Sequence, residues 1–263
     1  MKKPSTAYHR QNFLRRAFSK ENAERPARPY LIADWDSVVM LHLEVDPESL
    51  QKAVPYTVDQ FAGRSFVTLV AFTIHRMRPV MGGRLGEFLF RPIATHPFLN
   101  VRTYVRHQGR PGIHFMAEWL PNRLSVFLGP RVFALPYQWG ELSYRHAADT
   151  GNFTGTVRDR SSQTRLEYEA TRSSTQPTAP PSADHALDTF LCERYTAFNA
   201  QKGRKCLFHV WHPPWKMELL KARLNETSLL THHWPWLRKS VLMRAHFSKQ
   251  LKDVGMGRPL KVV

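Results

Sequence analysis

The chain has 263 residues, of which 42% are hydrophobic and 12% aromatic, and its formal net charge is +17 at pH 7. The large apolar side chains exclude a disordered polar chain, and no apolar run approaches the ~18 residues that a transmembrane helix needs. Two cysteines exclude a disulfide framework, so we expect plain thiols and a reducing, cytoplasmic location.

The positive charge is concentrated at the two ends of the chain. Residues 1–30 hold eight Lys and Arg against two acids, residues 202–263 hold thirteen against three, and residues 31–201 hold seventeen against sixteen. A nucleic-acid domain is expected to carry its basic face on the folded core. We therefore predict a basic N-terminal extension over 1–30 and a single domain over 31–263. Weak nucleic-acid binding through the basic ends is kept only as a third hypothesis.

Patterns typical of strands dominate the first two thirds of the chain. Residues 35–45 form a β-branched and apolar run that predicts a strand. A short helix is expected directly after it, because Asp46 can cap a free backbone amide, Pro47 suits the first turn and Glu48 complements the helix dipole. Further strands are predicted over 66–77, 132–146 and 165–171, and a Gly- and Pro-rich loop over 78–97.

The stretch 98–107 is the most informative, because polar side chains alternate there with small apolar ones. Successive side chains of a strand point to opposite faces. One face therefore carries Asn100, Arg102, Tyr104 and Arg106. This face is either solvated, as charged residues mostly are, or it lines a polar pocket inside a barrel. The residues alone leave both interpretations open.

A turn rich in Gly and Pro follows at 108–112 and predicts that the chain returns over 113–120 as the second strand of a hairpin. On that strand strict alternation places His114, Met116 and Glu118 on one face. His114 and Glu118 are therefore candidates for the same pocket.

The pattern changes near the C-terminus. Residues 173–183 contain prolines and several hydroxyls, which indicates an exposed loop. A helical period follows over 184–195, with Asp184 as its cap, and a second helical piece is predicted over 214–224. The end of the domain is thus expected to be a helical, basic segment.

Histidines raise the question of a metal. His209 and His212 are three residues apart, and His232 and His233 are adjacent. No Cys pair accompanies them, and the nearby prolines break the helix that would align such ligands. We expect no metal and no cofactor, and His42 is expected to be packed and hydrogen-bonded. The Trp- and His-rich stretch 211–236 is expected to pack against the mouth of a barrel as a lid.

Several segments in order resemble the domain of unknown function 2071 family of the acetoacetate decarboxylase-like superfamily. They cover roughly residues 30–260. The matching segments are Trp35 with the strand to His42, Phe61-Ala62-Gly63-Arg64, Asn100-Val101-Arg102-Thr103-Tyr104-Val105, Gly109-Arg110-Pro111-Gly112, Leu135-Pro136-Tyr137, Glu193-Arg194-Tyr195 and His212-Pro213-Pro214-Trp215. The resemblance implies a mainly β (α+β) fold, a closed antiparallel β-barrel with flanking helices and an internal pocket. The family has no established activity.

The chain departs from acetoacetate decarboxylase at the residues that carry its chemistry. The stretch 129–138 is similar to the decarboxylase segment with two lysines, one of which forms the Schiff base. Those lysines fall on Tyr137 and Gln138, and neither can form an imine. The acidic residue that the family pattern places shortly before Asn100 is also missing, because Phe98 or its neighbours hold that place. An enolate stabilised by nearby polar groups remains as a route for decarboxylation.

Arg102 suits a bound carboxylate because its planar fork donates two parallel hydrogen bonds. Its alternative is a buried ion pair with Glu118 or Glu141. Tyr104 and Tyr137 offer hydroxyls to the same pocket, and packing with a satisfied hydroxyl is their alternative.

The candidate ligand-binding residues are thus Asn100, Arg102, Tyr104, His114, Glu118 and Tyr137. The leading hypothesis is a barrel protein that binds a small anionic metabolite, a carboxylate or keto acid, with lyase- or hydrolase-like activity. The alternative is a noncatalytic ligand-sensing or interaction module. The two differ in whether Arg102→Ala or Tyr137→Phe abolishes turnover or only affinity.

Overall fold

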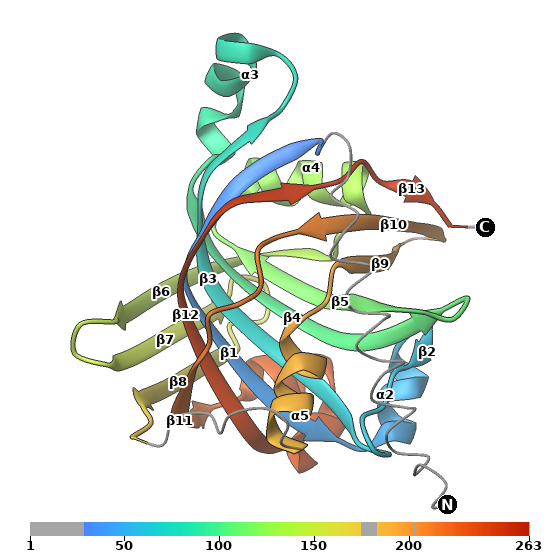
Figure 1. Cartoon of the computed structure of the whole chain (residues 1–263), viewed down its shortest axis with the longest axis vertical. Coiled ribbons are helices and arrows are strands. Elements are labelled where there is room, and N and C mark those ends of the chain that lie inside the picture. The colour runs from blue at the N-terminus through green and yellow to red at the C-terminus, as the bar shows by residue number, and fades with distance from the viewer. Residues whose placement is uncertain (1–28, 175–182, 202, 263) are drawn as a thin grey trace, which may run out of the picture.

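The structure is a computed structural model that describes residues 29–174, 183–201 and 203–262 (Figure 1). The basic extension predicted over 1–30 lies almost wholly outside the described residues, as does most of the loop predicted over 173–183. Within the described part strands predominate, so the chain is mainly β as expected. No helix in this part is long and apolar enough to cross a membrane.

The first half of the chain contains, in order, β1 (Leu31–Val45), α2 (Pro47–Ala53), β2 (Thr57–Val58), β3 (Ser65–Pro79), α3 (Gly83–Phe90), η1 (Arg91–Ile93), β4 (His96–His107), β5 (Arg110–Leu120) and α4 (Arg123–Phe133). The second half contains β6 (Tyr137–Ala147), β7 (Asn152–Asp159), β8 (Arg165–Arg172), α5 (Ala183–Cys192), β9 (Thr196–Gln201), β10 (Arg204–Trp211), β11 (Glu218–Glu226), α6 (Ser228–His233), η2 (Pro235–Lys239), β12 (Val241–Met256) and β13 (Leu260–Lys261).

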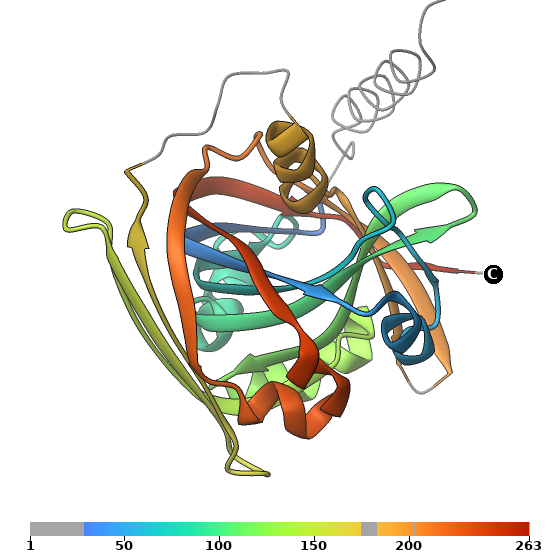
Figure 2. The same cartoon turned by 90° about the horizontal axis from the view of Figure 1, so that it is seen from below.

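The described strands form one sheet of 13 strands in the order β13-β10-β9-β5-β6-β7-β8-β11-β12-β1-β3-β4-β2. Two further pairings, β4 with β5 and β10 with β12, join strands that are separated in that order. The pairings are antiparallel apart from those of β5 with β6 and β9. Figure 2 shows the strands curving around a common interior, with α5 along one side.

The expected helix after the first strand is confirmed as α2. The Asp46 side chain accepts a hydrogen bond from the backbone N–H of Ser49 at 2.8 Å, which satisfies one of the free amides at the helix start. Pro47 stands in the first turn, where its missing N–H costs nothing.

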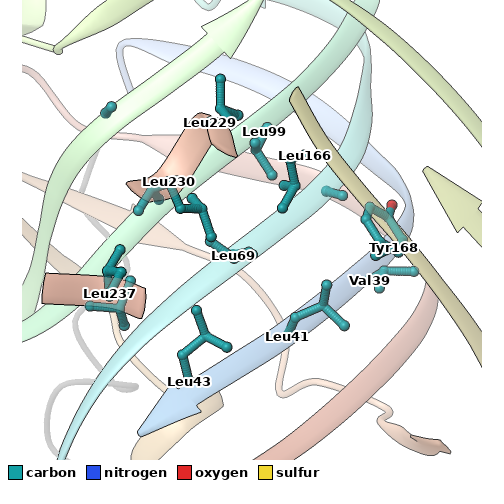
Figure 3. Packing of buried hydrophobic residues seen from close by; sticks show 14 of the residues in the cluster. Val39, Leu41, Leu43, Leu69, Leu99, Leu166, Tyr168, Leu229, Leu230 and Leu237 are labelled. Atoms are coloured by element: carbon teal, nitrogen blue, oxygen red, sulfur yellow. The ribbon is translucent and has the colours of Figure 1, made fainter. Parts of the chain in front are cut away.

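The strand β1 is buried on both faces, and each face meets a different core. Val39, Leu41 and Leu43 of β1 belong to the core that α6 and η2 cover through Leu229, Leu230 and Leu237, which we call the α6-side core (Figure 3). The alternate residues Val38 and Met40 belong to a second core, which surrounds a pocket and which we call the pocket-side core.

One predicted element near the C-terminus is wrong, and the start of a predicted strand in the middle of the chain is displaced. The helix expected over 214–224 is the strand β11, whose side chains alternate in burial with the period of two that a strand imposes. The basic end of the chain is therefore built mainly of strands, with only α6 and η2 helical. The strand expected from 132 begins at Tyr137, because α4 extends to Phe133.

Two other expectations need adjustment. The predicted loop over 78–97 contains α3 and η1 between the ends of its flanking strands. The helix expected over 184–195 exists as α5, but it ends at Cys192. This leaves Arg194 and Tyr195 outside the helix, and Arg194 reaches the pocket.

Candidate functional site

A pocket with a cavity volume of about 100 Å³ lies in the pocket-side core. Most of its wall is apolar, with Phe72, Phe98 and Phe115 among the lining residues. The polar and charged side chains that reach it are Asn100 and Arg102 of β4, Glu118 of β5, Tyr137 at the start of β6, Arg194 after α5 and His212 after β10. A small apolar cavity with a few convergent polar groups is the usual form of a small-molecule site.

The polar face of β4 turns into the protein. Asn100, Arg102 and Tyr104 are only 8%, 6% and 0% exposed, so the solvated interpretation is wrong for them. Arg106, the fourth residue of the predicted face, is exposed as that interpretation expects. The opposite face carries Leu99 and Val101, which pack in the α6-side core. β4 is therefore buried on both faces. The apolar residues Leu99 and Val101 alone do not indicate that the opposite, polar face is buried as well.

The guanidinium of Arg102 is buried without a counter-ion in the described part of the chain, where no carboxylate oxygen lies within 4.0 Å of it. Its Nη2 lies 3.8 Å from Met40 Sδ, and its Nε has no hydrogen-bond partner among those residues. The alternative of an ion pair with Arg102 is wrong, since Glu118 makes no ion pair with any described residue and Glu141 pairs with Arg160 on the surface. A buried charge in this state is costly, and a bound anion would offset the cost.

The second arginine of the pocket is matched by protein groups. Arg194 Nη2 lies 3.1 Å from Asp59 Oδ2, and the other oxygen of Asp59 accepts a hydrogen bond from Arg106 Nε at 2.7 Å. The Arg194 guanidinium also lies 4.3 Å from the ring centre of Phe190. Sequence reasoning quoted the Glu-Arg-Tyr motif that contains Arg194 but did not place this side chain at the pocket.

A β-bulge in β5 changes which side chains face the pocket. Val101 pairs with Ala117, but the next residue, Arg102, pairs with Phe115, so Phe115 and Met116 together oppose one residue of β4. Such an extra residue reverses the alternation beyond it and re-aims the following side chains. The prediction that His114, Met116 and Glu118 share one face is therefore wrong.

Because of the bulge, Glu118 faces the pocket and His114 does not. His114 Nδ1 lies 2.8 Å from the carbonyl oxygen of Phe198 and is packed, which was the alternative to a ligand contact. Burial raises the pKa of Glu118 well above its usual value, and its Oε2 has no hydrogen-bond partner in the described structure. The raised pKa favours the protonated carboxyl, which can donate a hydrogen bond.

Glu118 stands opposite Asn100 in the pairing of β5 with β4. Asn100 Oδ1 is buried without a hydrogen-bond partner in the part of the chain described. Strand pairing therefore brings a carboxyl and an amide together at the pocket.

Tyr137 lies beside Glu118 in the parallel pairing of β5 with β6. Its ring packs against Gly129 of α4, where an added Cβ would lie 2.2 Å from the Tyr137 Cε2 atom, so only glycine fits there. Burial, and then the nearby Glu118 carboxyl, raise the pKa of Tyr137 well above its usual value. Its hydroxyl stays protonated and is a hydrogen-bond donor at the pocket.

Tyr104 packs with a satisfied hydroxyl, which was the alternative to contact with a ligand. Its hydroxyl donates to the carbonyl oxygen of Leu191 at 2.7 Å and lies 2.7 Å from Thr68 Oγ1, so it is occupied outside the pocket. Of the six predicted ligand-binding residues, four line the pocket: Asn100, Arg102, Glu118 and Tyr137.

His212 and Trp215 also line the pocket. Burial lowers the pKa of His212 to about 4, and Arg102 acts in the same direction. The Trp215 ring centre lies 6.0 Å from that of Trp35, and its backbone N–H donates to Glu193 Oε1 at 3.0 Å. Of the lid predicted over 211–236, only the first part reaches the pocket, through His212 and Trp215. Trp234 and Trp236 pack on the α6-side core instead.

Comparison with known proteins gives a family and a fold. Residues 32–252 match the model of the family DUF2071, described as an uncharacterized conserved protein. The uncharacterized protein YqjF of Bacillus subtilis (strain 168) is 24% identical over 242 residues, which cover 89% of this chain and 94% of that protein.

Solved structures of known proteins share the architecture. An acetoacetate decarboxylase-like enzyme from Sphingomonas wittichii RW1 has a TM-score of 0.63 at 13% identity, over 90% of this chain and 94% of that one. The enduracididine biosynthesis enzyme MppR complexed with pyruvate has a TM-score of 0.60 at 13% identity, over 91% of this chain and 93% of that one. At such identities the similarity establishes the fold alone.

Proposed function

Since the chain belongs to the DUF2071 family of uncharacterized conserved proteins, we propose a function from its pocket: it binds a small carboxylate or keto acid and processes it by lyase-type chemistry without a Schiff base. The observation that carries this proposal is the buried guanidinium of Arg102, which lines the pocket with no carboxylate within 4.0 Å in the described residues.

Charge and size select the ligand class. A buried cation without a partner favours an anion, and the planar guanidinium matches a carboxylate with two parallel hydrogen bonds. A cavity of about 100 Å³ holds a few water molecules or one small organic anion, but not a nucleotide. The pyruvate bound to the structural neighbour MppR belongs to the same class of small keto acids.

Glu118 and Tyr137 supply the chemistry in this proposal. Burial raises the pKa of both side chains well above the usual values, which favours the protonated forms that donate hydrogen bonds to a carbonyl oxygen of the ligand. Such donors, together with the positive charge of Arg102, stabilise the negative charge that collects on this oxygen when an enolate forms. Tyr137 and Gln138 stand where acetoacetate decarboxylase has its two lysines, and neither can form an imine. The electron pair released in the reaction therefore goes to the carbonyl oxygen of the ligand and not to an imine.

The first experiment is a thermal-shift screen with pyruvate, acetoacetate, other small carboxylates and inorganic phosphate. Wild type is compared with Arg102→Ala and with Arg223→Ala, a control in which an arginine that is 70% exposed on β11 is removed. A ligand at 100 times its Kd adds about 2.7 kcal/mol to the free energy of unfolding. We expect a carboxylate or keto acid to shift wild type and the control only. A shift retained by Arg102→Ala, or no shift with any carboxylate, contradicts the proposal.

A second experiment separates an enzyme from a sensor. The compound that shifts wild type is incubated with the protein and followed by proton NMR, beside Glu118→Gln and Tyr137→Phe. Loss of turnover with retained binding in these variants supports the lyase. Binding without turnover in wild type favours the noncatalytic ligand-sensing module, the alternative that the missing lysines suggest.

We also propose that the sheet is a closed barrel around this pocket. The pairings of β4 with β5 and of β10 with β12 support it, as does the hydrogen bond from the Gly257 amide to the His209 carbonyl oxygen at 2.7 Å. If the seam is closed, the Gly257 amide exchanges its hydrogen as slowly as amides in the centre of the sheet. Fast exchange at Gly257 alone contradicts closure.

We also propose that the protein resides in a reducing compartment, the cytoplasm. Cys192 and Cys206 are both free and buried, which fits a protein that never meets oxidising conditions. Fractionation of cells that express the tagged full-length chain tests it, and recovery outside the cytoplasm contradicts it.

A further inference from the structure

A second cluster of buried polar side chains lies outside the pocket, where α5 covers the sheet (Figure 1). It consists of His42 of β1, His246 of β12 and Cys192 of α5, with exposed fractions of 0%, 1% and 4%. One ligand atom of each lies within 4.8 Å of the other two. His42 Nε2 is 3.0 Å from His246 Nδ1, which in turn is 3.9 Å from Cys192 Sγ.

Hydrogen-bond partners determine which nitrogen of His42 carries the hydrogen. The Tyr104 hydroxyl donates to the carbonyl oxygen of Leu191 at 2.7 Å, and a carbonyl can only accept. The Thr68 hydroxyl, 2.7 Å from that of Tyr104, must therefore donate to it. No proton of Thr68 is left for His42 Nδ1, 2.9 Å away, so Nδ1–H donates to Thr68. With the hydrogen on Nδ1, the Nε2 atom of a neutral His42 presents a lone pair.

The same reasoning applies to His246. Its Nε2 lies 3.0 Å from Asp188 Oδ1, and a nitrogen at this distance from a carboxylate oxygen must carry a hydrogen. Arg244 Nη2 donates to the other oxygen of Asp188 at 2.8 Å and keeps the carboxylate in place. A neutral His246 therefore presents a lone pair at Nδ1 toward the lone pair of His42 Nε2. Two lone pairs 3.0 Å apart repel each other, so an electropositive atom is needed between them.

We propose that a zinc ion occupies this place, bound by His42 Nε2, His246 Nδ1 and Cys192 Sγ. Imidazole nitrogen and thiolate sulfur are the usual zinc ligands, and tetrahedral Zn–N and Zn–S bonds place two nitrogens about 3.3 Å apart and nitrogen and sulfur about 3.6 Å apart. The separations of 3.0 Å and 3.9 Å lie close to these values. Three protein ligands leave one coordination position open, as in catalytic zinc sites.

The surroundings of the two histidines are those of metal ligands. The other ring nitrogen of each lies close to an oxygen, His42 Nδ1 at 2.9 Å from Thr68 Oγ1 and His246 Nε2 at 3.0 Å from Asp188 Oδ1. Oxygens in these positions orient the rings of metal-binding histidines. The Cys192 thiolate would bring one negative charge to the dication, and the Asp188 carboxylate, which also pairs with Arg244, lies beside His246. The cysteine and the aspartate are four residues apart on α5 and so lie on the same face of that helix.

The competing occupant is a proton, which would make His246 an imidazolium that donates to both Asp188 and His42. A proton joins only the two nitrogens, whereas zinc also takes the Cys192 sulfur as a thiolate. A metal with a visible spectrum that reports bound thiolate therefore distinguishes the two.

The test is a titration of the full-length protein, stripped with a chelator, with Co²⁺. We expect one equivalent to bind with the strong visible bands of a four-coordinate site and a thiolate-to-cobalt charge-transfer band, and Zn²⁺ to remove both. Cys192→Ser abolishes the charge-transfer band. Cys206→Ser is the matched control, because this other buried thiol lies on β10 beside the Phe133 carbonyl oxygen and leaves the band intact. No band in wild type, or a band that persists in Cys192→Ser, overturns the proposal.

A second variant keeps the test decisive if Cys192→Ser does not fold. Asp188→Asn retains the three ligands but weakens the partner of His246, and such changes cost about 10–100-fold in metal affinity. Zinc affinity is measured by competition with a chromogenic chelator, with circular dichroism to verify the fold. An Asp188→Asn affinity equal to that of wild type contradicts the zinc site.

Discussion

At the residue scale, the pocket combines one guanidinium that has no counter-ion among the described residues and one that forms an ion pair. Arg102 has no carboxylate within 4.0 Å in the part of the chain described, whereas Arg194 lies 3.1 Å from Asp59. The two arginines line the same pocket, so the difference between them comes from their partners and not from burial. This contrast makes them a matched pair for mutagenesis.

Replacing Arg102 by Met is expected to stabilise the ligand-free protein by about 1–4 kcal/mol, because an unpaired buried charge is exchanged for an apolar side chain of similar length. Arg194→Met is expected to destabilise it, since Asp59 loses a buried partner. Urea unfolding in the absence of ligand measures both. Destabilisation by both variants to the same extent would show that Arg102 is a structural residue.

Glu118 leads to a prediction for the dependence of stability on pH. Its pKa is raised in the folded state, so above the ordinary value of 4.5 the unfolded chain ionises first and stability falls as pH rises. Glu118→Gln removes this loss. We expect the variant to match wild type at pH 4 and to be more stable than wild type at pH 8. Urea unfolding at both values tests this, and equal stability at pH 8 is the contrary result.

At the element scale, the bulge in β5 and the close packing of α4 place the polar groups of the pocket. The bulge opposite Arg102 turns Glu118 inward, and Gly129 lets the helix approach the ring of Tyr137. The side chain of Asn122 caps α4 by accepting a hydrogen bond from the Ser125 amide at 3.0 Å. The pocket therefore depends on backbone features that contact no ligand.

Gly129→Ala tests this dependence. The added Cβ would lie 2.2 Å from the Tyr137 ring, so the ring has to move, at a cost of about 1–3 kcal/mol in stability. We expect weaker binding of the carboxylate found in the screen, as measured by calorimetry. Val132→Ala on the same helix is the control, because Val132 is 38% exposed and its loss costs about 0.5 kcal/mol or less. Unchanged affinity in Gly129→Ala would show that the position of the Tyr137 ring does not affect ligand binding.

At the scale of the whole molecule, buried histidines determine the response to acid. Burial lowers the pKa values of His96, His146 and His212 to about 4. Between the ordinary value of 6.5 and 4 the unfolded chain therefore binds more protons than the folded one, and stability falls as pH falls.

We expect the free energy of unfolding to drop through this window by up to about 3 kcal/mol for each of the three side chains. His96→Gln should flatten the curve, and His232→Gln, which lies on α6, should leave it as in wild type. Unfolding by urea at intervals from pH 7 to pH 4 measures the slope. A stability that is constant over this range would contradict the prediction.

The net charge of +17 is also a property of the whole molecule. Because the basic residues after 202 stand mainly on strands of the sheet, they are spread over the fold and not gathered in a loose tail. We expect a protein lacking residues 1–28 to bind duplex DNA negligibly at physiological salt, in a filter-binding assay. Tight binding by this shortened chain that resists added salt would revive the nucleic-acid hypothesis.

The sequence by itself determined the features that depend on neighbouring residues. Alternation predicted the shared face of Asn100 and Arg102, the Asp46 cap predicted α2, and the absence of lysine at Tyr137 excluded an imine. These follow from covalent geometry and side-chain chemistry, which need no distant partner.

Only the tertiary structure decided the rest. Whether the polar face of β4 meets water depends on the strands that enclose it, and Glu118 turns inward because a bulge, which alternation does not reveal, shifts the pairing with β4. His42, Cys192 and His246 come together from β1, α5 and β12. Such contacts join positions up to 204 residues apart, where burial and strand pairing, and not local spacing, set the geometry.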